Sequence, residues 1–399
     1  MNKPTVSRRI ASVAASPMRR FAPLIAAAEA AGVEVMKLNI GDPDFAAPDL
    51  FFRTLHGYDG PTVPYAPATG RPEIVAAWIR YYRRLGVRLE AANILPTTGG
   101  AEAILMSLLT VADPGDEIIV FEPLFTCFKA GAKAYNIRLT PISLAQEGGF
   151  ALPPDSAIKK KITARTRAIV VINPDNPTGK LWPQAEIDRL VRLAVRHGLF
   201  LISDETYREI VFRGRPTTIL KNRLARENAI VIDSLSKRFS VPGARAGALV
   251  SHRADIIAQA TKLAMIRAAS PTIEQLACAP LLDDSARLIR GLANEYRHRR
   301  DAVIKELKRW PAVGYHIPGG AFYLVLKLPV NGEDFVSFML NDFRHQNRTV
   351  ALTPLASFYL TPSLGHDQVR FALVKPPREL RAAVRLIGLG LAAYAAKRR

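Results

Sequence analysis

Cysteine is scarce in this 399-residue sequence, which contains only Cys127 and Cys278. Two cysteines are too few for a disulfide scaffold, so we expect a reducing, cytoplasmic setting. The sequence also has no uninterrupted apolar run of about 18 residues, so we expect no membrane-spanning helix. The polar, basic N-terminus lacks the apolar core of a signal peptide, so export is not indicated.

Acidic residues are few relative to basic ones, 35 against 55, which gives a net charge of +20. Such a charge could attract nucleic acid. However, the basic residues are spread along the chain, and the sequence contains no zinc-finger spacing, RNP-like motif, internal repeat or low-complexity segment. We therefore expect no nucleic-acid partner and no metal site. The same basic field would favour an anionic cofactor and substrate.

A lysine follows an apolar β-branched run in the segment Ile230–Gly247. Residues Ile230–Ile232 predict a buried strand, so Lys237 lies near the carboxyl end of a strand, where open α/β sheets bind ligands. A partly desolvated lysine there is a usable amine at neutral pH and can form a Schiff base. Ser234 before it and Arg245 after it could both bind a phosphate.

These residues form the patterns S-L-S-K and G-A-R-A-G, separated by a short run. The arrangement resembles the Schiff-base lysine segment of the class I/II aminotransferases, which depend on pyridoxal phosphate (PLP). The resemblance implies that Lys237 forms the Schiff base and that Ser234, Ser236 and Arg245 hold the cofactor. Further motifs follow in family order from about Ile40 to the final helix.

Two glycines, Gly99 and Gly100, stand where a short strand gives way to an apolar helix. Backbone N–H groups and the helix dipole favour an anion at such a position. By resemblance, this is the phosphate cup, and Ala101 lacks the hydroxyl or amine that many relatives carry there. Phe125 follows the expected strand Asp116–Phe121, where the family stacks an aromatic ring on the pyridine. Ordinary core packing is the alternative for this ring.

Two more expected strands end in polar motifs. Ala168–Ile172 leads into N-P-D-N-P-T-G, in which Asn176 matches the asparagine that contacts the ring oxygen and the substrate carboxylate. Leu199–Ile202 leads to Asp204, and a buried acid is costly unless it is paired. By resemblance, Asp204 pairs with the protonated pyridine nitrogen, and Tyr207 hydrogen-bonds the ring oxygen.

Other matches concern the substrate and the neighbouring subunit. Arg370 lies in an apolar expected strand, Val369–Val374, and matches the arginine that binds the substrate α-carboxylate bidentately. Gly41 matches the glycine whose backbone approaches that carboxylate. Arg267 resembles the arginine that binds a distal carboxylate across a dimer, which would favour aspartate or glutamate; a surface arginine is the alternative. Tyr65, in Y-A-P-A-T-G, matches a tyrosine that reaches the cofactor phosphate of the other subunit, so we expect a homodimer.

By the same resemblance, the fold is α/β, of the aspartate aminotransferase type. A large domain with a mostly parallel sheet between helices is joined by a smaller α+β domain. We assign residues 1–45 to the N-terminal part of the small domain, 46–283 to the large PLP-binding domain and 284–399 to the rest of the small domain. The other expected elements are helices at Pro17–Ala31, Asp284–Trp310, Asp334–Phe343 and Pro377–Ala395, and strands at Ala248–Ser251 and Val350–Leu352.

The expected function is transfer of an amino group between an amino acid and a 2-oxo acid by ping-pong kinetics, with Lys237 as general base and acid. The same fold also hosts lyases, racemases, decarboxylases and oxidases. Arg370 and Asn176 favour transamination, because they clamp the carboxylate that a decarboxylase must release. A transcriptional regulator would need a DNA-binding domain, for which the short N-terminal extension leaves no room.

Overall fold

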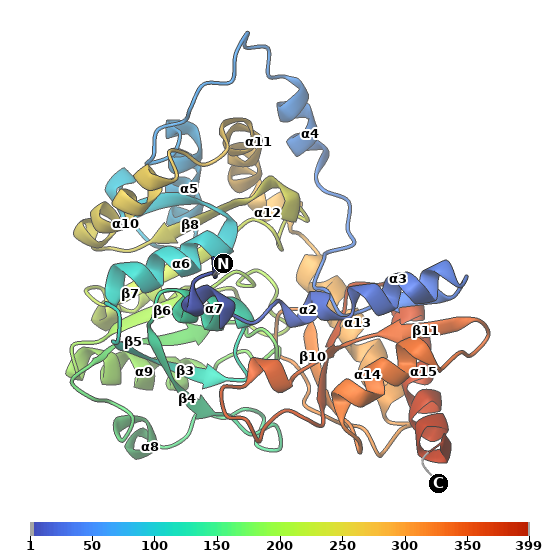
Figure 1. Ribbon diagram of the computed structural model, residues 1–399. Coiled ribbons are helices and arrows are strands. Elements are labelled where there is room, and N and C mark those ends of the chain that lie inside the picture. Colours follow the sequence, from blue (N-terminus) through green and yellow to red (C-terminus); the bar gives the residue numbers. More distant parts are fainter. Residues whose placement is uncertain (1–3, 398–399) are drawn as a thin grey trace.

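The computed structural model describes residues 4–397, and a seven-stranded sheet lies at its centre (Figure 1). In spatial order its strands are β2 (Ile94–Thr98), β8 (Ala246–Val250), β7 (Ala229–Ser234), β6 (Phe200–Asp204), β5 (Thr166–Ile172), β3 (Glu117–Glu122) and β4 (Arg138–Ser143). Strands β7, β6, β5, β3 and β4 run parallel, whereas β8 is antiparallel to both of its neighbours. The predicted strands of this sheet are therefore confirmed.

Alternating side chains of each central strand enter two different cores. In β5, Ile169 and Val171 point into one core, and Val170 and Ile172 into the other. This is the period of two that a strand buried on both faces requires. One face is covered by α5 (Pro72–Arg84), α9 (Gln184–Arg196) and α11 (Thr272–Asp283), and the other by α6 (Gly99–Val111), α7 (Thr126–Ala134) and α10 (Ala254–Ile266).

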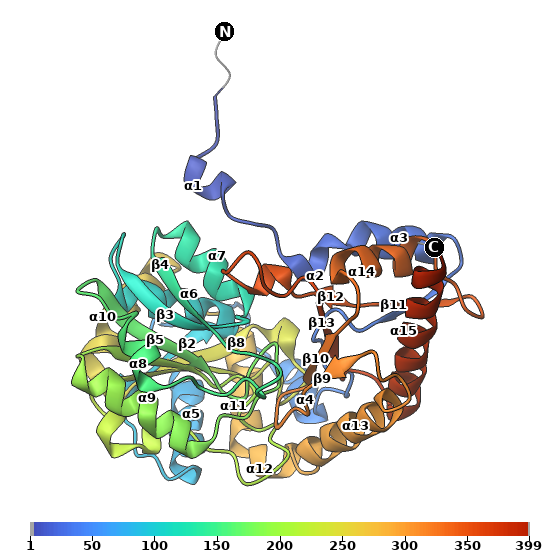
Figure 2. The same ribbon diagram turned by 90° about the horizontal axis from the view of Figure 1, so that it is seen from below.

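A second body, built from both ends of the chain, lies beside the large sheet (Figure 2). It holds an antiparallel sheet of β12 (Thr353–Pro354), β13 (Gln368–Ala372), β10 (Tyr323–Lys327) and β9 (Gly314–Tyr315). A separate parallel pair joins β1 (Glu34–Lys37) to β11 (Arg348–Ala351). Its helices are α2 (Pro17–Arg20), α3 (Ala22–Ala30), α13 (Leu292–Leu307), α14 (Gly332–Asn341) and α15 (Pro377–Lys397).

Two predicted helices are interrupted. The helix expected over Pro17–Ala31 breaks at Phe21, which separates α2 from α3. The helix expected over Asp284–Trp310 breaks at Gly291, whose φ of 84° is left-handed, so that α12 (Ser285–Leu288) ends before α13 begins. The other helices are α1 (Arg8–Ala11), α4 (Asp49–His56) and α8 (Asp155–Lys159).

Within residues 4–397, no helix combines the length and apolar character that crossing a bilayer would need. The same part of the chain contains no group of three or more His, Cys, Asp or Glu side chains arranged to hold a metal ion.

Candidate functional site

Lys237 lies just beyond the carboxyl end of β7. The strand is buried along its whole length, and the turn that follows it turns the lysine side chain toward the second body. Lys237 Nζ donates a hydrogen bond of 2.6 Å to the carbonyl oxygen of Gly41. Burial lowers the pKa of this amine to about 8. The amine therefore carries a larger neutral, nucleophilic fraction near neutral pH than an exposed lysine does.

Asp204 is the last residue of β6, the parallel neighbour of β7. Its Oδ1 accepts a 3.0 Å hydrogen bond from the backbone N–H of Thr206. Among the described residues, no cation pairs with this carboxylate, and burial raises its pKa to about 6. A buried acid without a cation has the environment that suits a positively charged ligand atom.

A cavity of about 170 Å³ opens between these strand ends. Ten predicted site residues line it: Gly100, Ala101, Phe125, Asn176, Asp204, Tyr207, Ser234, Ser236, Lys237 and Arg245. Three lining residues were not predicted: Ile104, Thr206 and Pro242. The sequence signal for Thr206 was its position between Asp204 and Tyr207, whereas Ile104 and Pro242 are apolar residues without a distinguishing pattern.

The start of α6 and Arg245 form one side of this cavity. Arg245 is left-handed, with φ of 50°, and its guanidinium donates to the carbonyls of Pro242 at 2.9 Å and Thr98 at 3.3 Å. Gly99 also has a positive φ, and a Cβ there would come within 2.8 Å of Arg245 Nη2. A glycine lets the first turn of a 13-residue helix and a guanidinium approach each other, and both attract an anion.

Arg370, on β13 of the second body, does not line the cavity but contacts the lining residue Asn176; Gly41 and Gly99 also lie outside the lining, each against a lining residue. Its side chain is fully buried, with Nη1 donating to Asn176 Oδ1 at 2.9 Å and Nη2 to the Asn39 carbonyl at 2.8 Å. Arg370 Nε is buried and has no hydrogen-bond partner. A buried guanidinium with a free donor is suited to an incoming carboxylate. Arg370 and Asn176, predicted from segments far apart in the sequence, are therefore in contact.

Tyr323 belongs to the same site and was not predicted. Its hydroxyl lies 2.9 Å from the hydroxyl of Tyr207, and the Arg370 guanidinium lies 4.4 Å from the centre of its ring. A Cβ on Gly41 would come within 1.8 Å of the Tyr323 hydroxyl oxygen. Only glycine therefore fits at position 41 in this arrangement. A tyrosine at the start of an apolar strand gives little sign of such a role in the sequence.

Tyr65 and Arg267 lie outside the cavity lining. Tyr65 is 88% exposed. Arg267 follows α10 and is held within its own chain: Nη1 donates to Thr98 Oγ1 at 3.1 Å and to Ser270 Oγ, and lies 3.0 Å from Glu102 Oε2. Thr98 thus has Arg245 on its carbonyl and Arg267 on its hydroxyl.

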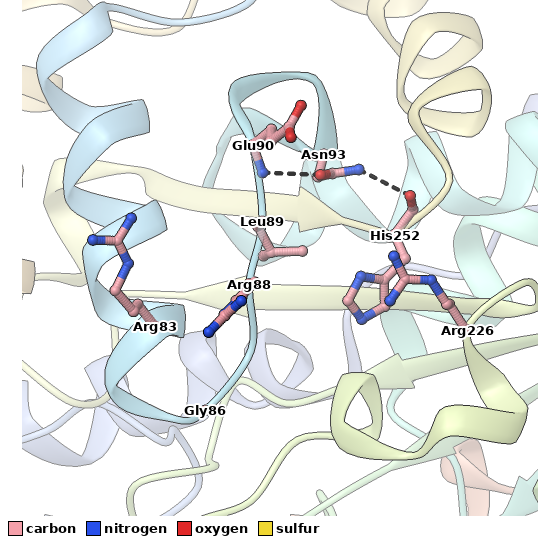
Figure 3. A pocket seen from close by; sticks show the side chains of 8 residues that line it. All are labelled: Arg83, Gly86, Arg88, Leu89, Glu90, Asn93, Arg226 and His252. Carbon is pink, nitrogen blue, oxygen red and sulfur yellow. Dashed lines mark hydrogen bonds between the residues drawn. The ribbon is translucent and has the colours of Figure 1, made fainter.

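A larger hollow, of about 870 Å³, lies at the ends of β2 and β8 that are remote from Thr98 and Arg245; Figure 3 shows the side chains that line it. It adjoins Asn93, which precedes β2, and His252, which follows β8, and it is also lined by Arg83, Arg88 and Arg226. None of the predicted site residues lines it. The smaller cavity is therefore the candidate active site.

Comparison with known proteins agrees with this geometry. The sequence matches the family described as aminotransferase class I and II over residues 33–387. It is 31% identical to the aspartate/prephenate aminotransferase of Thermus thermophilus, over 74% of this chain and 77% of that protein. It is 29% identical to the arginine–pyruvate transaminase of Pseudomonas aeruginosa, over 90% of each chain. The solved structure of Thermus thermophilus aspartate aminotransferase with maleate superposes with a TM-score of 0.88 at 25% identity, covering 97% of this chain and all of that one.

Proposed function

Because the chain belongs to the class I and II aminotransferases, it is a PLP-dependent aminotransferase, and we propose that the cavity between β6 and β7 is its active site. One observation carries the proposal: the partly desolvated amine of Lys237 and the buried carboxylate of Asp204, which has no cation beside it, line the same cavity. The amino group passes from an amino acid to a 2-oxo acid.

The cavity residues fit PLP. Asp204 offers a buried negative charge to a protonated ring nitrogen, and Phe125 offers a ring to stack on the pyridine. Arg245 and the first turn of α6, with the Ser234 and Ser236 hydroxyls 3.0 Å apart, offer donors for the phosphate. Each of these groups suits the part of PLP that the sequence assigns to it.

When bound, PLP withdraws electrons from the substrate carbon that loses its proton. Lys237 Nζ takes that proton and returns it, which its pKa of about 8 allows near neutral pH. Asp204 would accept the hydrogen bond of the ring N–H, and Asn176 and Tyr207 would supply donors to the ring oxygen.

Arg370 and Asn176 orient the substrate. Arg370 Nε has no partner and Arg370 contacts Asn176, so the two side chains can serve one carboxylate, and a bidentate guanidinium–carboxylate pair fixes both position and direction. Holding the α-carboxylate this way favours loss of the Cα proton over loss of the carboxylate. This supports transamination over decarboxylation.

Replacing Lys237 tests the active-site assignment. We expect Lys237→Ala to abolish turnover and to lose the borohydride-reducible linkage to PLP, because no other amine lines the cavity within residues 4–397. Mass spectrometry of the reduced, digested protein measures the linkage. Lys262→Ala, on the exposed face of α10, is the matched control and should keep both. A Lys237→Ala protein that retained the reduced linkage would reject the assignment.

We further propose a dicarboxylic amino donor, with Arg267 of one subunit serving the site of the other. Arg267 Nε and Nη2 are buried and have no hydrogen-bond partner, so they remain available to a carboxylate. The relative from Thermus thermophilus is named for aspartate and prephenate. Glu102 partly neutralises this arginine, however, and Ala101 adds no cation. That pairing, together with the arginine–pyruvate relative, supports a neutral or basic donor as the second candidate.

Substitution of Arg267 separates the two donors. Removing one partner of a buried guanidinium–carboxylate pair costs about 2–5 kcal/mol, which is roughly a 30- to 5,000-fold loss. We expect Arg267→Ala to lower kcat/KM for aspartate or glutamate by that factor while changing the value for alanine much less. Initial rates with a panel of amino acids and 2-oxoglutarate provide the measurement. If kcat/KM fell equally for all amino donors, Arg267 would have only a structural role. If the wild-type enzyme were inactive on aspartate and glutamate, the neutral or basic donor would remain.

A homodimer completes the proposal. Tyr65 would reach the phosphate of the neighbouring site, and its ring is exposed, as are the apolar side chains of Val63 in the same loop and of Met265 and Ile266 at the end of α10. The Thr272 hydroxyl donates to the carbonyl of Pro64 at 2.7 Å, which ties this loop to α11. Such a surface is suited to burial between two copies.

Because Cys127 and Cys278 are both free thiols, we also propose a reducing, cytoplasmic location.

A further inference from the structure

Beneath the proposed active site lies a group of buried charged side chains, which we call the buried arginine cluster. It consists of Glu205, Arg208, Glu209, Asp233 and Arg238. Each of these residues is at most 8% exposed. Three carboxylates and two guanidinium groups can be removed from water only if they are paired and hydrogen-bonded. The hydrogen bonds and ion pairs of the cluster therefore show which parts of the backbone it connects.

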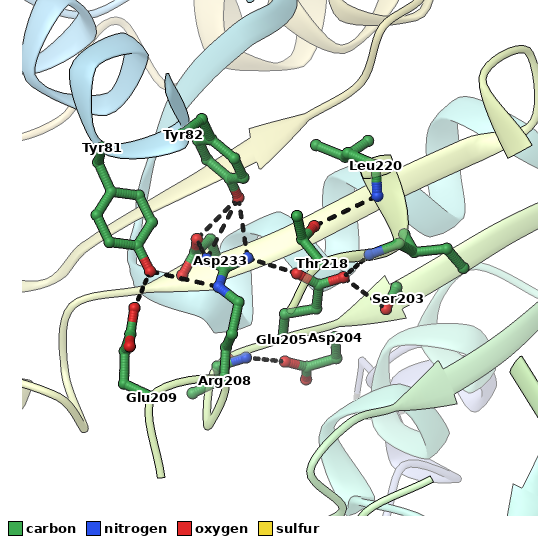
Figure 4. Close-up of polar contacts among 12 residues, drawn as sticks. Tyr81, Tyr82, Ser203, Asp204, Glu205, Arg208, Glu209, Thr218, Leu220 and Asp233 are labelled. Carbon is green, nitrogen blue, oxygen red and sulfur yellow. Dashed lines mark hydrogen bonds and ion pairs between the residues drawn. The ribbon is translucent and has the colours of Figure 1, made fainter. Parts of the chain in front are cut away.

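Asp233, on β7, lies between the two arginines. Its Oδ2 accepts hydrogen bonds from Arg208 and from the Tyr82 hydroxyl, the latter at 2.8 Å (Figure 4). Its Oδ1 accepts from Arg238 and from the backbone N–H of Ser234, the latter at 2.8 Å. One carboxylate thus joins β7 to α5, to the turn after β6 and to the segment after β7.

Arg208 extends the cluster to β6. Its Nη1 donates to Glu205, whose Oε1 accepts from Ser203 Oγ at 3.1 Å and from the Ile219 N–H at 2.9 Å (Figure 4). Its Nε donates to the hydroxyl oxygen of Tyr81 at 3.3 Å. The guanidinium therefore connects the ends of both central strands to a helix on the far side of the sheet from α6.

The members of the cluster alternate along the chain with residues of the active-site cavity. The four neighbouring pairs are Asp204–Glu205, Tyr207–Arg208, Asp233–Ser234 and Lys237–Arg238. In each pair one side chain lines the cavity and the other belongs to the cluster. Asp233 and Ser234 are adjacent within β7, where successive side chains point to opposite faces, so anchoring Asp233 fixes the direction of Ser234. In the other three pairs, the anchored side chain holds the short backbone segment that carries its cavity-lining neighbour.

We propose that Arg208 and Arg238 are positioning residues, which hold Asp233 between them and so direct Lys237 and Asp204 into the cavity. The inference rests on the proposed roles of Lys237 and Asp204. Neither arginine touches the cavity. Their effect on catalysis is therefore indirect: they set the position and orientation of the Lys237 amine and the Asp204 carboxylate in the cavity. Misplacement by about 1 Å is enough to reduce a rate by roughly 100-fold.

Arg238→Met in the PLP-loaded enzyme tests this role, because methionine keeps much of the apolar volume and removes the charge. Two quantities are measured: the pH midpoint of the visible absorbance of bound PLP, and kcat separately from KM. We expect the midpoint to move by about half a unit or more and kcat to fall roughly tenfold or more, with little change in KM. Arg238→Lys, which keeps the cation, should restore the midpoint toward the wild-type value.

A matched control removes an ion pair far from the strand ends. Arg189 pairs with Asp155 at 2.8 Å, between α9 and α8. Arg189→Met should lower the thermal midpoint without moving the absorbance titration or kcat. If Arg238→Met yields no folded holoenzyme, Tyr82→Phe removes one neutral donor from Asp233 and should give a smaller shift in the same titration.

A cluster that serves only stability would give a different result. In that case Arg238→Met, or Tyr82→Phe in its place, would lower the thermal midpoint and leave the absorbance titration and kcat unchanged, which would overturn the proposal. Failure of the active-site assignment is a separate outcome, because it shows as a retained borohydride linkage in Lys237→Ala whatever the Arg238 variants do.

Discussion

At the scale of single residues, Asp204 carries a conflict between folding and cofactor binding. Its carboxyl pKa is raised from 3.8 to about 6 by burial, so the folded chain binds this proton more tightly than the unfolded chain. The ionised group therefore destabilises the cofactor-free fold at neutral pH, and this penalty disappears as the pH falls through 6 toward 4. Bound PLP would supply the missing positive charge.

We therefore expect cofactor-free Asp204→Asn to be more stable than the cofactor-free wild type at pH 8. A shift of about two pKa units corresponds to about 3 kcal/mol. Urea unfolding of both proteins at pH 8 and pH 4 measures the difference, which should shrink at pH 4. With PLP present the order should reverse, because the amide cannot hold the ring proton. A wild type that is more stable without PLP at pH 8 would contradict this account.

Much of the site was predictable at the residue scale because strand ends and polar motifs coincide. Asp204 and Lys237 each follow an apolar run, and Asn176 lies in a turn rich in proline. Arg370 was visible as a charge inside an apolar strand. Tyr323 was missed for the opposite reason, because an aromatic residue beside an apolar run is typical of a core. Its role depends on the second body lying against β6, which no local pattern encodes.

At the scale of elements, the segment after β1 is fitted closely to β10. A Cβ on Gly41 would overlap the Tyr323 hydroxyl, and that ring is confined by Tyr207 and Arg370. We expect Gly41→Ala to destabilise the fold by about 1–3 kcal/mol through overpacking. It should also raise KM for the amino substrate, since Lys237 binds the Gly41 carbonyl. Thermal unfolding and initial rates measure the two effects.

Gly148→Ala is the matched control, because an added Cβ there meets nothing closer than a carbonyl oxygen at 3.8 Å. It should leave stability and KM near wild type. The double variant Gly41→Ala/Tyr323→Phe removes the overlapping hydroxyl and should recover part of the lost stability. Equal stability of Gly41→Ala and Gly148→Ala would argue against the close fit.

The interrupted helices show where element boundaries escaped prediction. Helical periodicity continues through Phe21, yet the chain turns there so that α3 can cover the second body. At Gly291 the signal was present, because glycine readily adopts the left-handed backbone that ends α12. An amphipathic pattern on both sides of this glycine favoured one long helix instead.

For the whole molecule, two copies would share each active site. We propose that Tyr65 contacts the cofactor phosphate in the partner subunit's site. Each site would then take Lys237 from one subunit and Tyr65 from the other. Mixing the Tyr65→Ala and Lys237→Ala variants should form heterodimers that contain one site with both native residues. Random exchange would then restore about a quarter of wild-type activity. Turnover before and after mixing measures this, and two Lys237→Ala preparations serve as the control. No recovery despite proven exchange would place Tyr65 in its own subunit's chemistry or outside the site.

The division into domains at residues 46 and 284 remains a proposal. It is supported by the separate core of the second body, which draws on residues 21–38 and 296–394 as well as on Tyr207, Ile210 and Phe212 beside β6. The last three show why a sequence boundary is only approximate. Side chains from the turn after β6 enter the other core, so the two bodies have no single border in the sequence.

The parallel pairing of β1 with β11 also has a consequence for synthesis on the ribosome. Lys37 and Ala351 are paired although 314 positions separate them, so β1 emerges long before its partner exists. At about 5–20 residues per second, that interval is roughly 15–60 s, while the central sheet has time to form. Gly41, whose carbonyl accepts a hydrogen bond from the Lys237 amine, lies shortly after the end of β1 at Lys37. Although Gly41 is synthesised first, its carbonyl can be held beside Lys237 only after β1 has found β11, so the proposed site is completed only once the last strands have left the ribosome.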